Sequence, residues 1–234
     1  ANDFYLEDTI VNNCTFEGND LSNGEYDNSF RILPTNATVT NSTFKNIQGK
    51  GNYANNSLAE FGILFAVNWG FTEESSNNIY DNCAIIIDNF TDNNSEIKNS
   101  YLYKRGNIGD LTLSTINLDD CTIKLDSNPL IFNNCNVEKC NFIRNTSLTG
   151  VYFTNSSFIS DSITSQDYFS GTYVFDASTI NVLGEISKTS FYNVEFLNNS
   201  KIILDRYSSV NLDIPKSNIG TDYTIECRGT EVID

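Results

Sequence analysis

The stretch from Leu111 to Val137 reads LTLSTINLDDCTIKLDSNPLIFNNCNV and contains most of what decides the fold. Its apolar residues alternate with polar ones in short runs, as in Leu111-Thr112-Leu113 and Ile123-Lys124-Leu125. A period of two is typical of strands that bury one face. The runs are separated by Asn, Asp and Ser, which favour tight turns. The stretch therefore predicts short strands joined by polar corners.

One phrase recurs along the chain: Asn or Asp, then Cys or Ser, then any residue, then an apolar residue. Its copies begin at Asn13, Asn41, Asn82, Asn99, Asp120, Asn134 and Asn155, and Asn193 begins a degenerate copy. The second positions are separated by 28, 41, 17, 21, 14, 21 and 38 residues. If the intervals of 41 and 38 each span two units, the average unit has about 20 residues, which indicates a solenoid.

Three short strands per unit predict an all-β fold, a right-handed parallel β-helix in which equivalent residues of successive coils stack. Some 10 to 12 coils, each adding about 4.8 Å, would form a rod roughly 50–55 Å long. The second position of the phrase is expected to form an inward column of Cys and Ser, beside a buried ladder of Asn side chains. We expect a single domain over residues 1–234, with loops projecting near 18–31 and 48–58.

The composition restricts the partners. Fourteen Lys and Arg against thirty Asp and Glu give a net charge of −16. Such a surface repels phosphate backbones and anionic lipids, which excludes nucleic acid as a partner. The chain has no His, so it lacks the commonest general base and metal ligand. No apolar run approaches the roughly 18 residues of a membrane span, and without an initiator Met the chain is expected to be part of a larger protein.

The cysteines are more readily explained as small buried side chains than as a disulfide framework or a metal site. The six are Cys14, Cys83, Cys121, Cys135, Cys140 and Cys227. Four of them occupy the second position of the phrase, where other copies have Ser. A zinc site would need two close pairs, and Cys135 and Cys140 form the single close pair of the chain.

Phrases such as Val11-Asn12-Asn13-Cys14-Thr15-Phe16 and Phe132-Asn133-Asn134-Cys135-Asn136-Val137 resemble the repeats of adhesin-like surface proteins of methanogenic archaea. Those proteins are similar to the polymorphic outer-membrane proteins of bacteria, and both groups belong with the pectate-lyase-like right-handed β-helices. The resemblance implies an extracellular location at the cell surface. It also implies binding to a glycan or to another cell.

Some enzymes of that fold degrade polysaccharides, so an enzyme is the alternative from another class. A hydrolase needs an acid and a base, for which Asp119 and Asp120 are the pair to consider. A lyase needs a basic residue, for which Lys104, Arg105 and Arg206 are the candidates. The chain lacks the Gly-His-Gly and Arg-Ile-Lys phrases of the hydrolases. Each basic residue is more readily explained as a solvated charge, so we expect no catalytic residue.

Aromatic residues supply the candidate binding surface, because sugar rings stack on aromatic faces. Tyr101, Tyr103, Tyr152 and Tyr168 are the candidates for an exposed platform, although each one is more readily explained as a residue that caps or fills the core. No cofactor is expected. Calcium is the single candidate ion, and its candidate ligands, which do not match a known calcium loop, are Asp88, Asp92 and Glu96, or Glu73 and Glu74.

Several Asn-x-Ser/Thr sequons are candidates for N-glycosylation. Asn36, Asn55 and Asn93 fall in expected loops, whereas Asn13, Asn41 and Asn155 are expected to be buried in the ladder.

Together these observations predict a non-enzymatic, adhesin-like module of the cell surface that binds a glycan or a cell-surface partner. The first alternative is a polysaccharide lyase or hydrolase. The second is a structural subunit of a sheath, a filament or a phage tail spike, in which the rod itself is the function.

Overall fold

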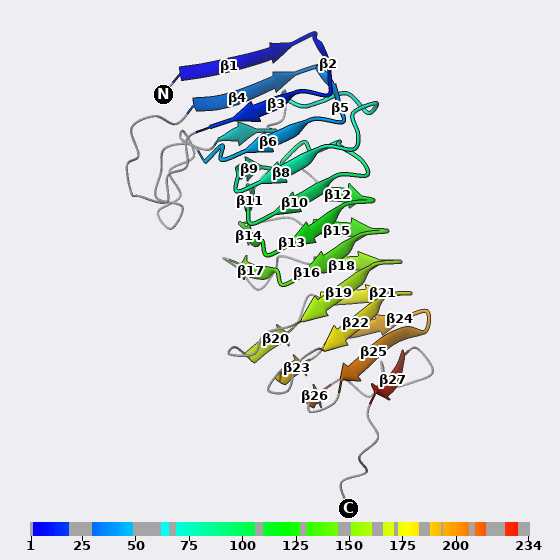
Figure 1. Ribbon diagram of the computed structural model, residues 1–234. Coiled ribbons are helices and arrows are strands. Elements are labelled where there is room, and N and C mark those ends of the chain that lie inside the picture. The colour runs from blue at the N-terminus through cyan, green and yellow to red at the C-terminus, as the bar shows by residue number, and fades with distance from the viewer. Residues whose placement is uncertain are drawn as a thin grey trace, which may run out of the picture.

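The computed structural model is a rod of stacked coils in which all assigned strands pair in parallel (Figure 1). The structure describes residues 2–18, 30–48, 62–65, 69–105, 110–126, 130–144, 151–160, 166–170, 173–182, 188–192, 194–205, 209–213 and 223–228. The described residues form no helix, and hence no helix long and apolar enough to cross a membrane.

Two long sheets run along the rod. The ten-stranded sheet contains β3 (Thr15–Glu17), β6 (Thr43–Lys45), β8 (Ile79–Asp81), β10 (Glu96–Lys98), β13 (Asn117–Asp119), β16 (Asn136–Glu138), β19 (Ser157–Ser160), β22 (Thr179–Val182), β25 (Ser200–Asp205) and β27 (Tyr223–Arg228). The seven-stranded sheet contains β1 (Asn2–Glu7), β4 (Phe30–Thr35), β7 (Ile63–Leu64), β9 (Ala84–Ile86), β11 (Tyr101–Lys104), β14 (Thr122–Leu125) and β17 (Asn141–Arg144).

Three shorter sheets complete the coils. The five-stranded sheet contains β12 (Leu111–Ser114), β15 (Leu130–Asn133), β18 (Val151–Thr154), β21 (Tyr173–Asp176) and β24 (Glu195–Leu197). The remaining strands are β2 (Ile10–Asn12) with β5 (Thr38–Thr40), and β20 (Gln166–Ser170) with β23 (Lys188–Tyr192) and β26 (Ser209–Asp213).

The predicted fold class, an all-β parallel β-helix, is confirmed. Each strand of the ten-stranded sheet belongs to a different coil, so the described residues contain ten coils, and their nine steps of about 4.8 Å give a rod about 43 Å long. The registers show that coils differ in length from 17 residues, between Ile79 and Glu96, to 36 residues, between Thr43 and Ile79.

The core is a continuous apolar interior that extends from Leu6 in the first coil to Ile202 in the ninth. Inward side chains of equivalent strands stack directly on one another, because the pairing is parallel and in register. Two stacks are aromatic: Phe16, Phe44 and Tyr80 in the upper coils, and Phe132, Phe153, Phe175 and Phe196 in the lower ones. Burial of these rings away from water is a main source of stability in the rod.

The repeated phrase marks two different corners of the coil, which the sequence did not separate. The first corner precedes the ten-stranded sheet and has left-handed backbone at Asn13, Asn41, Asn77, Asn94, Thr115, Asn134, Asn155, Ala177 and Asn199. The second corner follows this sheet and has left-handed backbone at Asn46, Asn82, Asn99, Asp120 and Lys139. Asn and Asp are enriched here because they tolerate this conformation best among residues with a side chain.

The assumption that the interval of 41 residues spans two units is therefore wrong. Ser42 lies at the first corner and Cys83 at the second, so the interval is one coil of 36 residues plus the step of five residues between corners. The phrase at Asn193 is not a copy either, because Val194 directly precedes β24 of the five-stranded sheet. The expected burial of Asn13, Asn41 and Asn155 is also wrong, since all three are exposed at the first corner.

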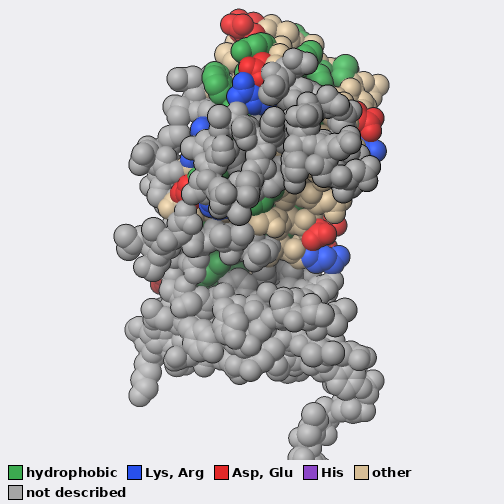
Figure 2. Space-filling view, turned by 90° about the vertical axis from the view of Figure 1, so that its left-hand side faces the viewer, with side chains coloured by type: hydrophobic (Ala, Val, Ile, Leu, Met, Phe, Trp, Pro, Cys, Tyr) green, Lys and Arg blue, Asp and Glu red, His purple; other side chains and the backbone are tan. Residues whose placement is uncertain are grey.

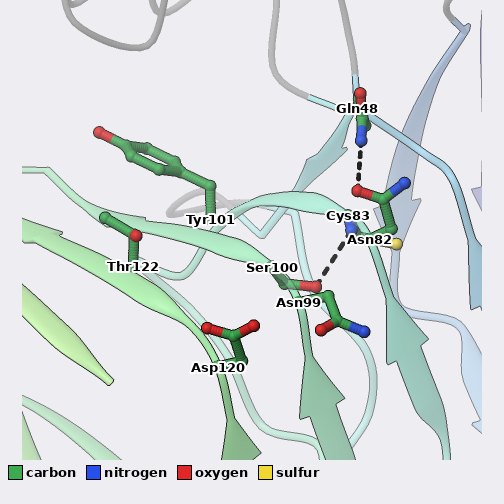
Figure 3. A pocket seen from close by; sticks show the side chains of 8 residues that line it. All are labelled: Gln48, Asn82, Cys83, Asn99, Ser100, Tyr101, Asp120 and Thr122. Atoms are coloured by element: carbon green, nitrogen blue, oxygen red, sulfur yellow. Dashed lines mark hydrogen bonds between the residues drawn. The ribbon is translucent and has the colours of Figure 1, made fainter. Parts of the chain in front are cut away.

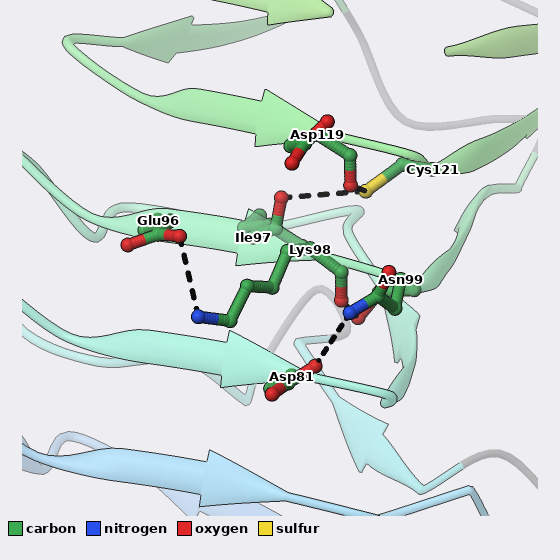
Figure 4. A network of polar contacts seen from close by, with 8 residues as sticks. Asp81, Glu96, Ile97, Lys98, Asn99, Asp119 and Cys121 are labelled. Carbon is green, nitrogen blue, oxygen red and sulfur yellow. Dashed lines mark hydrogen bonds and ion pairs between the residues drawn. The ribbon is translucent and has the colours of Figure 1, made fainter. Parts of the chain in front are cut away.

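The outward face of the ten-stranded sheet has a column of alternating charge over its first five coils. Glu17, Lys45, Asp81, Lys98 and Asp119 are successive register partners in this column. The Lys45 ammonium lies 3.6 Å from the Glu17 carboxylate, and Lys98 forms an ion pair at 3.4 Å with Glu96 on its own strand (Figure 4).

The two predicted loop segments fall largely outside the described residues, although Phe30 and Arg31 belong to β4. At the N-terminal end of the rod, hydrophobic side chains are visible on the surface (Figure 2). Among the described residues of the first coil, Phe4, Tyr5 and Ile10 are 46%, 63% and 86% exposed. The strands of this first coil pair on one side only within the described part of the chain.

Candidate binding groove at the second corner

The second corner presents a regular series of polar side chains along the rod. Each corner residue has left-handed backbone and is followed by a residue that points inward, such as Cys83 after Asn82 or Ser100 after Asn99. Backbone hydrogen bonds hold successive corners together, because the Asn82 N–H donates to Lys98 O at 3.1 Å and the Asn99 N–H to Asp119 O at 3.0 Å. The polar groups of neighbouring coils are therefore fixed relative to one another.

A hollow of about 300 Å³ lies across four successive second corners (Figure 3). It is lined by Gln48, Asn82, Cys83, Asn99, Ser100, Tyr101, Asp120 and Thr122. This volume is at the lower end of the range of small-molecule sites. We call this hollow the corner groove.

The Asn amides at the corner each use one N–H donor in a contact between coils. The Asn82 amide donates to Asn46 Oδ1 at 2.9 Å and accepts a hydrogen bond from Gln48. The Asn99 amide donates to Asp81 Oδ1 at 2.9 Å (Figure 4). The Asp120 side chain is exposed, and its carboxylate accepts no hydrogen bond from the described residues. The groove is therefore rich in acceptors and carries negative charge.

Tyr101 supplies the aromatic side of the corner groove. It is the first residue of β11, and its side chain is half-buried (Figure 3). Burial, with a smaller contribution from the nearby Asp126 carboxylate, raises the pKa of Tyr101 to about 12. The phenol is therefore neutral over the physiological pH range and can act as a hydrogen-bond donor.

The structure separates the residues of the enzyme alternative into two groups. Asp119 and Asp120 lie at the second corner, where Asp119 faces Lys139 at 3.8 Å. Lys104 and Arg105 lie at the other end of β11, about 10 Å further along the strand direction than Tyr101. These acidic and basic residues therefore do not form one site.

Lys104 and Arg105 are also not solvated charges. Lys104 is fully buried, on the inward face of its strand, where its register partner in the next coil is Leu125. Burial lowers the pKa of Lys104, opposed by the Asp88 and Asp110 carboxylates. Arg105 forms an ion pair with Asp88, whose carboxylate accepts hydrogen bonds from the Arg105 backbone N–H at 2.8 Å and from its Nε at 2.5 Å.

The predicted tyrosine platform is not formed by the tyrosines whose side chains are described. Tyr103 is 2% exposed, its hydroxyl donates to Asp126, and the Lys124 ammonium lies 5.1 Å from its ring centroid. Tyr152 is 36% exposed but belongs to the five-stranded sheet, away from Tyr101 in the seven-stranded sheet. Tyr168 lies in β20, and its side chain is outside the described residues.

The first set of candidate calcium ligands has other contacts, whereas Glu73 and Glu74 are exposed. Asp88 is paired with Arg105, and Glu96 with Lys98. Asp92 is 2% exposed and accepts hydrogen bonds from the Tyr80 hydroxyl at 2.6 Å and from the Asn78 amide at 3.0 Å. Among the residues that the structure describes, no three Cys, Asp or Glu side chains converge as metal ligands.

The sequons have different environments. Asn36 is exposed and donates to Asp8 Oδ1 at 2.7 Å, whereas Asn93 is half-buried beside a second hollow of about 350 Å³. The hydroxyl of Ser95, which completes the Asn93 sequon, belongs to a residue that is 1% exposed. Asn55 lies outside the described residues.

The corner groove could not be derived from the sequence, although its residues carry a signal in it. Asn82, Asn99 and Asp120 each begin a copy of the phrase, and Tyr101 was a candidate binding residue. The sequence could not show that these copies of the phrase lie at the second corner whereas other copies lie at the first. Gln48 and Thr122 gave no signal.

Comparison with known proteins gives no family for this chain. No family model matches it, and no curated protein matches it. Among solved structures, it is similar to trypsin-treated QnrB1, described as a plasmid-mediated fluoroquinolone resistance protein, with 9% sequence identity over 95% of this chain and 91% of that chain. The TM-score of 0.19 is too low for this likeness to support an argument, so the fold assignment depends on the sheet topology.

Proposed function

We propose that this chain is a non-enzymatic binding module of the adhesin-like type, which acts at the cell surface and holds a glycan in its corner groove. The observation that carries the proposal is the groove itself, a hollow of about 300 Å³ that Tyr101 lines together with polar side chains such as Asn99 and Asp120. An aromatic side chain for the apolar face of a sugar, next to polar groups that bind its hydroxyls, is a chemically suitable arrangement for a saccharide.

The charge of the groove favours one class of glycan. Asp120 provides an exposed carboxylate, Asn99 uses one of its two amide N–H donors to bind Asp81, and the chain has a net charge of −16. A polyuronate would be repelled, whereas neutral sugars with many hydroxyl donors or sugars with ammonium groups would be attracted. We therefore expect preference for neutral and amino-sugar oligomers.

The test is titration calorimetry with three soluble probes: a neutral gluco-oligosaccharide, a chitosan oligosaccharide and an oligogalacturonate. Tyr101→Ala is expected to weaken binding of the preferred probe by about tenfold, corresponding to about 1.4 kcal/mol. Tyr152→Ala is the matched control, because it removes an exposed tyrosine from another sheet. Equal affinity of the two variants would contradict the proposal.

The same samples are analysed for chain length, with and without Ca²⁺. Unchanged oligomers support a binding module, and shortened oligomers would establish the lyase or hydrolase alternative. Asp120→Asn should weaken binding of the chitosan probe more than binding of the neutral one, because it removes the charge and keeps the shape of the side chain.

Assembly into a rod or filament is a second candidate function. It is supported by the exposed Phe4, Tyr5 and Ile10 at the N-terminal end, where the first coil pairs on one side only within the described residues. Exposed strand edges with apolar side chains promote association. Replacing Ile10 with Lys should abolish any concentration-dependent assembly seen by light scattering, and assembly that is unaffected would exclude this end as the contact.

A further inference from the structure

Cys121 and Cys140 occupy equivalent positions of consecutive coils at the second corner. The strands on either side fix this alignment, since Asp119 pairs with Glu138 and Thr122 pairs with Asn141. Paired parallel strands lie about 4.8 Å apart. Cα atoms of disulfide-bonded cysteines are about 4.4–6.8 Å apart, so the backbone already holds the two residues at a suitable separation.

The thiols at this corner are directed along the rod, toward the preceding coil. Cys83 Sγ donates to Phe44 O at 3.4 Å, and Cys121 Sγ donates to Ile97 O at 3.4 Å (Figure 4). The Cys140 Sγ donates to Glu138 O at 3.2 Å on its own coil, and its thiol is close enough to Cys121 for the two groups to affect each other's titration. Both cysteines are reduced in the structure.

A thiol is not required at this position for packing. Ser100 occupies the equivalent place in the coil before Cys121, where its hydroxyl donates to Lys98 O at 2.6 Å. The two cysteines also differ in access, because Cys121 is 2% exposed whereas Cys140 is half-buried. A small oxidant in solution therefore reaches Cys140 first.

We propose that Cys121 and Cys140 are a site of disulfide formation between coils, oxidised by a low-molecular-weight disulfide such as oxidised glutathione. The Cys140 thiolate attacks one glutathione sulfur, forms a mixed disulfide and releases one glutathione. The Cys121 thiolate turns away from Ile97 O and attacks Cys140 Sγ, releasing the second glutathione. The two thiols lose two electrons to the oxidant, and their two protons go to the two glutathione thiolates.

Two properties of the reaction follow from the environment. The hydrogen bond with Cys121, together with burial, raises the pKa of the Cys140 thiol, so oxidation should be slow at neutral pH and faster in alkaline buffer. The bond would close a loop between adjacent coils, so it should raise the midpoint of thermal unfolding of the oxidised protein. This inference is independent of the proposed glycan binding.

The experiment uses the full chain, folded by circular dichroism, with oxidised glutathione at about pH 8.5, near the pKa of a free thiol. Trypsin cleaves after Lys124 and Lys139, so Cys121 and Cys140 fall in separate peptides that a disulfide joins. Mass spectrometry without reductant is expected to find the joined peptides and to lose them after reduction. Cys83→Ser is the matched control, because it removes another thiol of the same column and should leave the joined peptides unchanged.

Cys121→Ser should yield a glutathione adduct on Cys140 and no joined peptides, which shows that Cys140 reacts with the oxidant and that Cys121 supplies the second thiol. Serine is tolerated at this corner, as Ser100 shows, so the variant should fold. The proposal is overturned if the folded protein gives no joined peptides, if Cys121 or Cys140 joins a different cysteine instead, or if the pair joins only in urea.

Discussion

Replacing Phe153 with leucine removes one of the two inner rings from the four-ring aromatic stack in the lower coils. Phe153 is fully buried, and its ring centroid lies 5.0 Å from that of Phe132 and 4.9 Å from that of Phe175. An aromatic pair contributes about 0.5–1.5 kcal/mol beyond its burial, so the loss of two pairs should cost about 1–3 kcal/mol. Phe153→Ala also removes apolar surface and leaves a cavity, and it should cost about 3–5 kcal/mol.

The assay is urea unfolding followed by circular dichroism, combined with native-state hydrogen exchange. Tyr152→Leu is the matched control, because Tyr152 is adjacent in β18 and 36% exposed, and it should change the free energy of unfolding by less than about 0.5 kcal/mol. In a solenoid each coil contacts only its neighbours. Loss of exchange protection in Phe153→Leu should therefore be concentrated in β15, β18 and β21.

Two results would refute this reasoning. If Phe153→Leu and Tyr152→Leu unfold at the same urea concentration, the ring contacts contribute no measurable stability. If protection decreases equally from β1 to β27, the rod behaves as one cooperative unit, and the assumption of coupling between neighbouring coils fails.

Three further predictions concern buried charged or titratable groups. Burial raises the pKa of Asp92, although hydrogen bonds from Tyr80 and Asn78 oppose this effect. The folded state therefore favours the protonated carboxyl, and the free energy of unfolding should decrease as the pH rises from about 4 through the raised pKa. Asp92→Asn should remove this pH dependence. In urea melts, the free energy of unfolding of the variant should therefore increase relative to that of the parent over the same pH range. A difference that stays constant with pH would contradict the assignment. Asp88→Ala should cost about 3 kcal/mol in chemical unfolding, because it removes the carboxylate that pairs with the Arg105 guanidinium and one of the two carboxylates near the buried Lys104. A loss below about 1 kcal/mol would show that solvent compensates. Lys104→Met should unfold at the same urea concentration as the parent or at a higher one, because an apolar side chain of similar length replaces a buried charge. A clear loss of stability would mean that Lys104 provides essential pairing.

The sequence predicted local structure better than it predicted the arrangement of the coils. Alternation in Leu111-Thr112-Leu113 and Ile123-Lys124-Leu125 was sufficient to predict strands, because a half-buried strand requires this pattern wherever it lies. The phrase predicted corners, because left-handed backbone selects Asn. It could not distinguish the two corners, since both impose the same conformation followed by the same inward position.

The sequence does not show which residues from other coils lie next to a given side chain, and this limited the prediction of the site. Tyr101 and Tyr103 both face outward from β11, yet Tyr101 lines the groove while Tyr103 is covered and bonded to Asp126. Lys104 is a comparable case, because its charge suggested solvent whereas the alternation along β11 places it inward beside Leu102. In both cases the decisive information is the position of residues from other coils, which no local pattern contains.

The column of alternating charge on the ten-stranded sheet has a consequence for fidelity of assembly. A chain made of similar coils can misalign by omitting one, so that β6 pairs with β10 instead of β8. Lys45 would then lie beside Lys98, and the same error one coil later would place Asp81 beside Asp119. Like charges placed directly opposite each other are destabilising, whereas the native order from Glu17 to Asp119 juxtaposes opposite charges; the alternation ends there, because Asp119 pairs with Glu138. Over these five coils, the charges therefore favour the native pairing over a pairing that omits one coil.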